Sequence, residues 1–151
     1  MEQRGGDQAL EGEKVVVDAS VVVKWFVEEE YSEEALMLRD SYVDGVIDLI
    51  APSLLCFEVI NALKYSGAFG EDELKEVLRA LDDYQITLFD LEGDYGEKAI
   101  EIAMRKGITM YDAAYVALAL VQDATLYTAD EKLLEKVNEF KRMRHVREFT
   151  L

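Results

Sequence analysis

Residues 14–26 read KVVVDASVVVKWF, and this stretch decides the fold. Three consecutive valines lead to Asp18, and a second apolar segment, 21–27, follows with the spacing of a helix. A short β-branched run with a polar stop is typical of a strand that is buried on both faces, as in a parallel sheet. A buried strand followed at once by a helix indicates an α/β fold.

The rest of the chain repeats this alternation of short apolar runs with helical patterns. Further strands are expected at 46–51, 87–91 and 125–128, with a possible edge strand at 145–149. Helices are expected at 32–43, 52–66, 71–84, 95–106, 111–121 and 131–140. Pro52 is expected in the first turn of its helix, and Gly107 after the end of another. The pattern favours a mainly parallel sheet covered by helices, rather than a helical bundle or a β-sandwich.

The length and composition bound the organisation of the chain. Its 151 residues fit one domain, 13–151, preceded by a flexible tail over 1–12 that is rich in glycine and poor in apolar residues. No apolar run approaches the roughly 20 residues of a membrane helix, and the first residues have no signal-peptide core. The single cysteine, Cys56, cannot form an internal disulfide. We therefore expect a cytoplasmic protein without a membrane segment.

The net charge of −16 argues against nonspecific adhesion to nucleic acid, because lysine and arginine normally supply that affinity. It does not exclude a nucleic-acid substrate, since screening leaves the local charge to decide. One basic cluster lies near the C-terminus: Lys141, Arg142, Arg144, His145 and Arg147. It is either an exposed helix and tail or a patch that binds a substrate or partner.

Four acidic residues lie inside apolar stretches: Asp18, Glu58, Asp112 and Asp130. Burying a carboxylate without a partner costs on the order of several kcal/mol, so a chain that does so repeatedly must supply compensation. No matching set of lysine, arginine or histidine residues accompanies these acids. A bound metal cation is the natural compensating charge.

Ordinary helix capping is the alternative for three of these acids. Asp18 and Asp130 each directly precede a predicted helix and can cap it. Asp112 has the spacing of a capping box with Thr109. Capping does not exclude metal binding, so both interpretations remain open. Asp18 and Asp130 also follow predicted strand ends, where ligands bind in parallel sheets.

Glu58 and Asp112 are expected on apolar faces of their helices, directed toward the core. At about 100° per residue, the neighbours of Glu58 are Leu54, Leu55, Ala62 and Tyr65, with Asn61 at the margin. The corresponding neighbours of Asp112 are Tyr115, Val116 and Ala119.

Oxygen ligands alone select hard ions, so the expected metal is Mg²⁺ or Mn²⁺. Zinc sites favour cysteine and histidine, of which this chain has one each. Ser20, Asn61 and Thr128 are candidates for hydrogen bonds to the acids or to a substrate. Ser20 and Thr128 also fit as ordinary turn hydroxyls, and Asn61 as a solvent-exposed polar residue.

Four strings in order along the chain together carry a family resemblance: VVVDASVVVKWF, PSLLCFEVINAL, YDAAYVALA and LYTADEKL. They resemble the successive motifs of PIN-domain ribonucleases, particularly the VapC-type toxins of prokaryotic toxin–antitoxin pairs. The resemblance runs from about Lys14 to Leu134. It implies a three-layer α/β/α PIN-like domain in which acidic residues converge on Mg²⁺ or Mn²⁺. The glycine-containing N-terminal extension and the strongly acidic balance depart from the family pattern.

By motif position, the resemblance implies that Asp18, Glu58, Asp112 and Asp130 form the catalytic and metal-binding set. Asp18 and Asp112 are assigned to direct metal contact, and Glu58 and Asp130 to metal contact or orientation of water. The implied reaction is metal-dependent hydrolysis of RNA phosphodiester bonds.

The resemblance also implies an antitoxin partner and a homodimer. An acidic cleft would attract an arginine or lysine of such a partner, which would displace metal or substrate. Helices 32–43 and 52–66 are candidate partner surfaces, and core packing is the default interpretation of both.

Three other functions would also use some of these residues. A noncatalytic PIN-like binding module would keep the acidic fold without turnover. A phosphoacceptor signalling domain needs a second acid beside Asp18, where this chain has Ala19 and Ser20. Nucleophilic hydrolysis by Cys56 or His145 is disfavoured, because one lies in an apolar helix and the other in the basic cluster. No glycine-rich nucleotide loop is present.

Overall fold

The centre of the computed structural model, which describes residues 12–150, is a five-stranded sheet of order β4-β3-β2-β5-β6. Its strands are β2 (Glu13–Val17), β3 (Ile47–Pro52), β4 (Thr87–Phe89), β5 (Thr125–Thr128) and β6 (Met143–His145). All four neighbouring pairs are parallel. The central strand β2 buries Val15, Val16 and Val17 completely, as expected for a strand covered on both faces.

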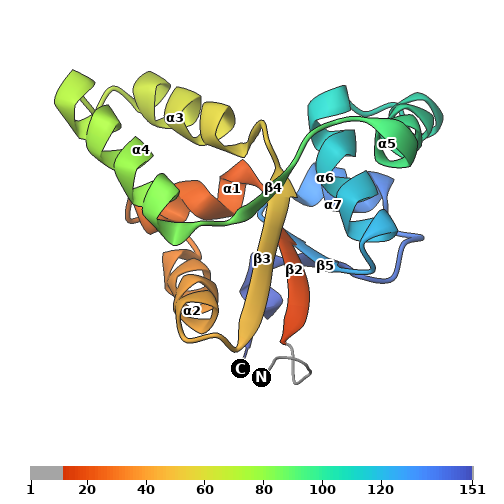
Figure 1. Ribbon diagram of the computed structural model, residues 1–151, viewed down its shortest axis with the longest axis horizontal. Helices are drawn as coiled ribbons and strands as arrows, with labels where there is room; N and C mark the ends of the chain where they lie inside the picture. The colour runs from red at the N-terminus through yellow and green to blue at the C-terminus, as the bar shows by residue number, and fades with distance from the viewer. Residues whose placement is uncertain (1–11, 151) are drawn as a thin grey trace.

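Helices cover both faces of the sheet. The helices are α1 (Ala19–Val22), η1 (Val23–Trp25), α2 (Ser32–Val43), α3 (Leu55–Ser66), α4 (Glu71–Tyr84), α5 (Gly93–Lys106), α6 (Met110–Val121), α7 (Glu131–Lys136) and η2 (Val146–Glu148). Figure 1 shows α1 to α4 on one side of the sheet and α5 to α7 on the other. The expected three-layer α/β/α architecture is confirmed.

Helix α6 is the most deeply buried helix, with Ala113–Ala119 shielded from solvent on all sides. It packs against β2, β3 and β5 on one side and against α5 on the other. The alanines let these layers approach closely, and Tyr95 of α5 donates its hydroxyl to the Ala114 carbonyl at 2.9 Å. The packing fixes the N-terminal turn of α6, which carries Asp112, over the carboxyl end of the sheet.

Helices α3 and α4 form a hairpin that extends away from the sheet, at the upper left of Figure 1. Helix α3 buries Leu55, Val59 and Leu63, whereas α4 buries only Val77 and Leu81. Because the core covers only this side of α3, Phe57 on the other side is 83% exposed. Glu58 lies in the first turn of α3, at the base of the hairpin.

The prediction that Pro52 opens a helix is wrong. Pro52 is the last residue of β3 and pairs with Phe89 of β4. The next residue, Ser53, donates its backbone N–H to the Phe89 carbonyl at 2.9 Å, and α3 begins only at Leu55. Proline lacks an N–H, but the end of a strand tolerates it, so pairing with β4 outweighed the preference of proline for a first helical turn.

The edge strand predicted at 145–149 is also displaced. The strand is Met143–His145, and a 3-10 helix follows it. His145 Nδ1 accepts from the Arg147 N–H at 3.0 Å, and the Glu148 carboxylate accepts from the His145 N–H at 3.1 Å. These side-chain hydrogen bonds satisfy the backbone locally and end the strand.

Three predicted elements differ in their bounds. The helix at 21–27 begins earlier and is divided into α1 and η1, and the strand at 87–91 ends at Phe89. The helix at 131–140 ends at Lys136, because the chain then turns so that the Arg142 carbonyl accepts from the Leu126 N–H at the sheet edge. The flexible tail predicted for 1–12 lies, apart from Gly12, outside the described residues.

Candidate active site

Asp18 follows the central strand β2 at the carboxyl end of the sheet and is 7% exposed. Its side chain does not cap α1, contrary to that alternative. Instead Ser20 donates its hydroxyl to Oδ1, and Thr128, at the end of β5, donates to Oδ2. Ser20 Oγ in turn accepts from the Ala129 N–H at 2.9 Å. The adjacent ends of β2 and β5 thus hold the Asp18 carboxylate in one orientation.

Burial raises the pKa of Asp18 to about 6. The hydrogen bonds from Ser20 and Thr128 oppose this rise, and the nearby Asp112 carboxylate adds to it. Desolvation therefore outweighs these two hydroxyl donors and the Val21 backbone N–H, which also lowers the pKa. Burial therefore destabilises the ionised Asp18 carboxylate, and a bound cation would stabilise it.

Glu58 projects from α3 toward α6, and its Oε1 accepts a hydrogen bond from the Tyr115 hydroxyl at 2.7 Å. Burial raises its pKa, the Tyr115 hydrogen bond lowers it, and Asp112 raises it. The expectation that Glu58 faces the core is confirmed in part, because Leu55 on its side of the helix is buried, whereas Ala62 and Tyr65 are exposed. Glu58 is half-buried at the edge of the core, where its carboxylate meets one buried tyrosine.

Asp112 lies in the first turn of α6 and is half-buried. Its backbone N–H donates to Thr109 Oγ1 at 3.0 Å, so Thr109 caps the helix and one half of the predicted capping box is confirmed. Burial raises the pKa of Asp112, and Asp130 raises it further, while Thr109 and Lys136 lower it. Because Asp112 also raises the pKa values of Asp18 and Glu58, it stands at the electrostatic centre of the set.

Asp130 follows β5 and is exposed. Its Oδ1 accepts from the Leu133 N–H at 3.1 Å, so the predicted capping of α7 is confirmed. The same carboxylate is close enough to raise the pKa of Asp112. Its capping role and its electrostatic coupling to the other acids coexist.

The donor chemistry of this set fits a hard divalent cation. The donors are carboxylate oxygens. The negative charge of Asp112 raises the pKa values of Asp18 and Glu58, and the charge of Asp130 raises that of Asp112. In the arrangement found across residues 12–150, no three Asp, Glu, His or Cys side chains enclose a metal position. Mg²⁺ commonly binds through one or two carboxylates and keeps several waters, or takes phosphate oxygens from a substrate. The acids therefore fit a partly hydrated ion rather than a closed protein cage.

Tyr115 and Lys136 are functional candidates that the sequence analysis did not identify. Tyr115 is 2% exposed, and its hydroxyl contacts Glu58 from a position 57 residues away in the chain. A buried tyrosine hydroxyl usually requires a partner, and this was the only signal available in the string YDAAYVALA. The Lys136 cation lowers the pKa of Asp112. Lys136 therefore offsets part of the negative charge around Asp112, and the sequence near Asp112 does not indicate this.

The basic cluster near the C-terminus is largely neutralised. Arg142 pairs with Asp123 at 2.8 Å, and Arg147 pairs with Glu131 at 3.4 Å. His145 is 1% exposed, and burial lowers its pKa. The cluster therefore forms part of the folded edge of the sheet and offers little unpaired positive charge.

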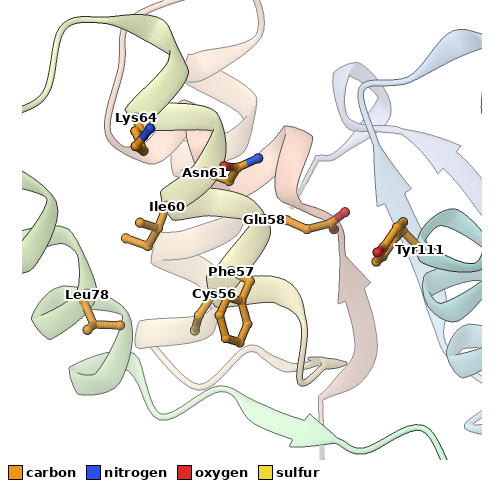
Figure 2. Close-up of a pocket in the computed structure, with 8 residues that line it drawn as sticks. All are labelled: Cys56, Phe57, Glu58, Ile60, Asn61, Lys64, Leu78 and Tyr111. Carbon is orange, nitrogen blue, oxygen red and sulfur yellow. The ribbon is translucent and has the colours of Figure 1, made fainter.

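A cavity of about 730 Å³ opens beside Glu58, between the α3–α4 hairpin and the start of α6. Its lining residues are Cys56, Phe57, Glu58, Ile60, Asn61, Lys64, Leu78 and Tyr111. Figure 2 shows Glu58 and Tyr111 pointing toward one another from opposite walls. Asn61 is exposed and lines this cavity with Glu58; it is not part of the Asp18 hydrogen-bond network that includes Ser20 and Thr128.

The chain is a parallel α/β domain in which Asp18 and Asp130 follow adjacent strands and Glu58 and Asp112 lie in the first turns of α3 and α6. Residues 15–139 match the model of the PIN domain, and the chain belongs to the PIN-domain family. It is 36% identical over 127 residues to Ribonuclease VapC3 of Pyrobaculum aerophilum, a match that covers 82% of this chain and 94% of that protein. It is 33% identical over 123 residues to Ribonuclease VapC1 of Mycobacterium tuberculosis, covering 80% and 89%.

Solved structures show the same fold. A toxin–antitoxin complex from Klebsiella pneumoniae contains a chain that aligns with a TM-score of 0.58 and 15% identity, over 80% of this chain and 89% of that one. The resemblance to the PIN-domain family expected from the four motifs is confirmed.

Proposed function

We propose that this chain is an endoribonuclease that depends on Mg²⁺ or Mn²⁺ and acts as the toxin of a toxin–antitoxin pair. Its curated relatives are ribonucleases by name, and the similarity spans most of each chain. The observation that carries the proposal is the buried Asp18 carboxylate, which the Ser20 and Thr128 hydroxyls hold at the carboxyl end of the sheet, near Asp112. Such a set of repelling carboxylates suits a cation-assisted reaction on a phosphodiester.

Asp18 and Asp112 would hold the ion, and Glu58 and Asp130 would contact it or orient water. When bound, a divalent ion lowers the pKa of a coordinated water and neutralises the charge that develops on the phosphate. Ser20 and Thr128 keep the Asp18 oxygens in place, so that carboxylate need not reorient on binding.

Glu58 is the best candidate for a general base. Burial raises its pKa above that of a free glutamate, which makes it a stronger proton acceptor. The Tyr115 hydroxyl fixes the position of Oε1, and Oε2 has no hydrogen bond among those described, so it can accept a proton from an attacking water. Asn61, on the next turn of α3, can donate to a phosphate oxygen.

The decisive test is cleavage of labelled single-stranded RNAs of varied sequence by the purified chain, with Mn²⁺, with Mg²⁺ or with EDTA. We expect cleavage with either metal, none with EDTA, and a loss of at least about 100-fold in Asp112→Asn. Asp83→Asn removes one charge from an exposed position on α4 and serves as the matched control. A folded wild-type chain that cleaves none of these RNAs with metal would favour a noncatalytic PIN-like module.

We extend the proposal to an antitoxin partner whose arginine or lysine side chain enters the acidic site. The similarity to a chain of a toxin–antitoxin complex supports this extension. Of the two helices predicted as partner surfaces, α3 exposes Phe57 and Tyr65, whereas α2 directs Ala35 and Leu38 into the core. Expression in a prokaryotic host should arrest growth, and a co-encoded partner should relieve the arrest. Arrest that persists in Asp112→Asn would contradict the nuclease-toxin assignment.

We also propose that the chain forms a homodimer and acts in a reducing cytoplasm. Exposed Ile100 and Met104 on α5 give a second copy an apolar contact, and Cys56 is a free thiol. In residues 12–150, every helix is too short or too polar to cross a membrane. Light scattering coupled to size-exclusion chromatography tests the dimer, and a monomer at micromolar concentration would contradict it.

A further inference from the structure

We infer that the cavity beside Glu58 is a subsite for an unpaired RNA base, which stacks on Tyr111 with Phe57 as the second aromatic wall. The inference rests on the proposed ribonuclease function and specifies how the substrate is held. Two positions in sequence motivate it: Phe57 directly precedes Glu58, and Tyr111 directly precedes Asp112. Each of these two acidic residues therefore carries a neighbouring aromatic side chain.

Both aromatic side chains are free of the core. Phe57 is 83% exposed and Tyr111 is 62% exposed, yet both line the cavity that contains Glu58. In Figure 2 Phe57 comes from α3, next to Glu58, and Tyr111 faces Glu58 from α6. Exposed aromatic rings beside a candidate catalytic carboxylate provide flat apolar surfaces where a nucleotide next to the scissile phosphate would lie.

The remaining lining suits the edge of a base. Ile60 and Leu78 form apolar walls, and Asn61 supplies an amide donor and acceptor beside them. The Lys64 ammonium lies 4.6 Å from the centre of the Tyr65 ring, and Lys64 lines the same cavity. The cavity thus combines stacking surfaces, one hydrogen-bonding amide and one cation, which is the combination that binds single-stranded nucleic acid.

The charge of the chain strengthens this argument. With a net charge of −16, the molecule as a whole repels RNA, and the arginines near the C-terminus are occupied by carboxylates. Ionic contacts therefore contribute little, so stacking and metal contacts must supply most of the affinity. Because stacking releases no counterions, RNA binding should depend only weakly on salt concentration.

The test is the binding of a short single-stranded RNA containing 2-aminopurine, whose fluorescence falls on stacking, with Ca²⁺ replacing Mg²⁺. We expect quenching by the wild type, and dissociation constants raised about tenfold in Phe57→Ala and Tyr111→Ala, the loss typical of one stacking contact. Tyr111→Phe keeps the ring and should restore quenching. Val121→Ala trims a 42% exposed side chain at the other end of α6 from Tyr111, outside the cavity, and should bind as the wild type does.

A change from 50 to 200 mM NaCl should weaken wild-type binding by less than about tenfold, against the much larger loss of proteins held by many phosphate contacts. Unaltered binding and quenching in both alanine variants would overturn the inference. Variants that bind RNA normally but no longer bind the co-encoded antitoxin would also overturn the inference, because the cavity would then be a binding site for a protein. If RNA is bound and quenched as expected but never cleaved with Mn²⁺, the proposed catalytic function fails and the base subsite stands.

Discussion

At the scale of single residues, the site depends on carboxylates placed where desolvation opposes their ionisation. Asp18 is the clearest case, since two hydroxyl donors do not return its pKa to the ordinary value. The proteins of this fold that bind a cation at such a position would recover the lost stability from the ion. In the metal-free chain no cation offsets the burial of the Asp18 charge, so this cost can be measured in the free energy of unfolding.

Asp18→Asn should stabilise the metal-free protein at neutral pH. The folded pKa of about 6 lies above the ordinary value of 3.8, so the folded state binds more protons and loses stability as pH rises from about 4 to 6. Above that range the cost is constant, at about 3 kcal/mol by the 1.36 kcal/mol per pKa unit. Urea unfolding in EDTA should show the gain at pH 7.5 and its disappearance near pH 4. A variant that is less stable than the wild type at pH 7.5 would refute this account.

Tyr115→Phe should reduce catalysis more than stability. Loss of the hydroxyl frees Glu58 to rotate, and removal of a hydrogen bond to a metal-site ligand typically costs about 10- to 100-fold in activity or metal affinity. The measurement is kcat/KM as a function of Mn²⁺ concentration. Tyr95→Phe is the matched control, because its hydroxyl is bound to the Ala114 carbonyl on the same helix. Equal losses in the two variants would indicate a purely structural effect.

Some of the candidate site residues could be predicted from the sequence. The four acids could be found because each interrupts an apolar run, and the hydroxyls of Ser20 and Thr128 because they match the family motifs. The contact between Tyr115 and Glu58 could not be found, because it joins residues 57 positions apart. One side of α3 is exposed because no other segment of residues 12–150 packs against it. The sequence of α3 itself does not indicate which side that is.

At the scale of elements, patterns that involve only local chemistry were predicted well. The helices α2 and α4 and the strand β5 have the predicted bounds, because periodicity and breakers specify them. The errors fall where a neighbouring strand decides. Pro52 belongs to β3 because β4 pairs with it, and the last strand ends at His145 because its own side chain and Glu148 cap the following turn.

Helix α6 is the element that positions the site, so its packing should be intolerant of added volume. Ala117→Leu inserts three carbons at a fully buried position in α6, and overpacking typically costs about 1–3 kcal/mol. The same substitution at exposed Ala62 on α3 should change stability by less than about 0.5 kcal/mol. Chemical denaturation of both variants measures the difference. Equal stabilities would mean that α6 is not held tightly between the sheet and α5.

At the scale of the whole molecule, the fold brings together acids from four separate segments. Asp18 and Asp130 follow adjacent parallel strands, while Glu58 and Asp112 come from the first turns of helices on opposite sides of the sheet. The sequence predicts this convergence through the rule that ligands bind at the carboxyl ends of parallel strands and through the family resemblance of the four motifs. The position of Asp112 near Asp18, Glu58 and Asp130 appears only in the folded chain.

The most direct test of the central claim is calorimetric titration of the RNA-free protein with Mn²⁺, comparing the wild type, Asp112→Asn and Asp83→Asn. The account predicts saturable binding in the wild type and in Asp83→Asn, and affinity at least about tenfold weaker in Asp112→Asn. Identical binding by all three proteins, or no binding by any, would contradict the claim that these acids share a hard divalent cation.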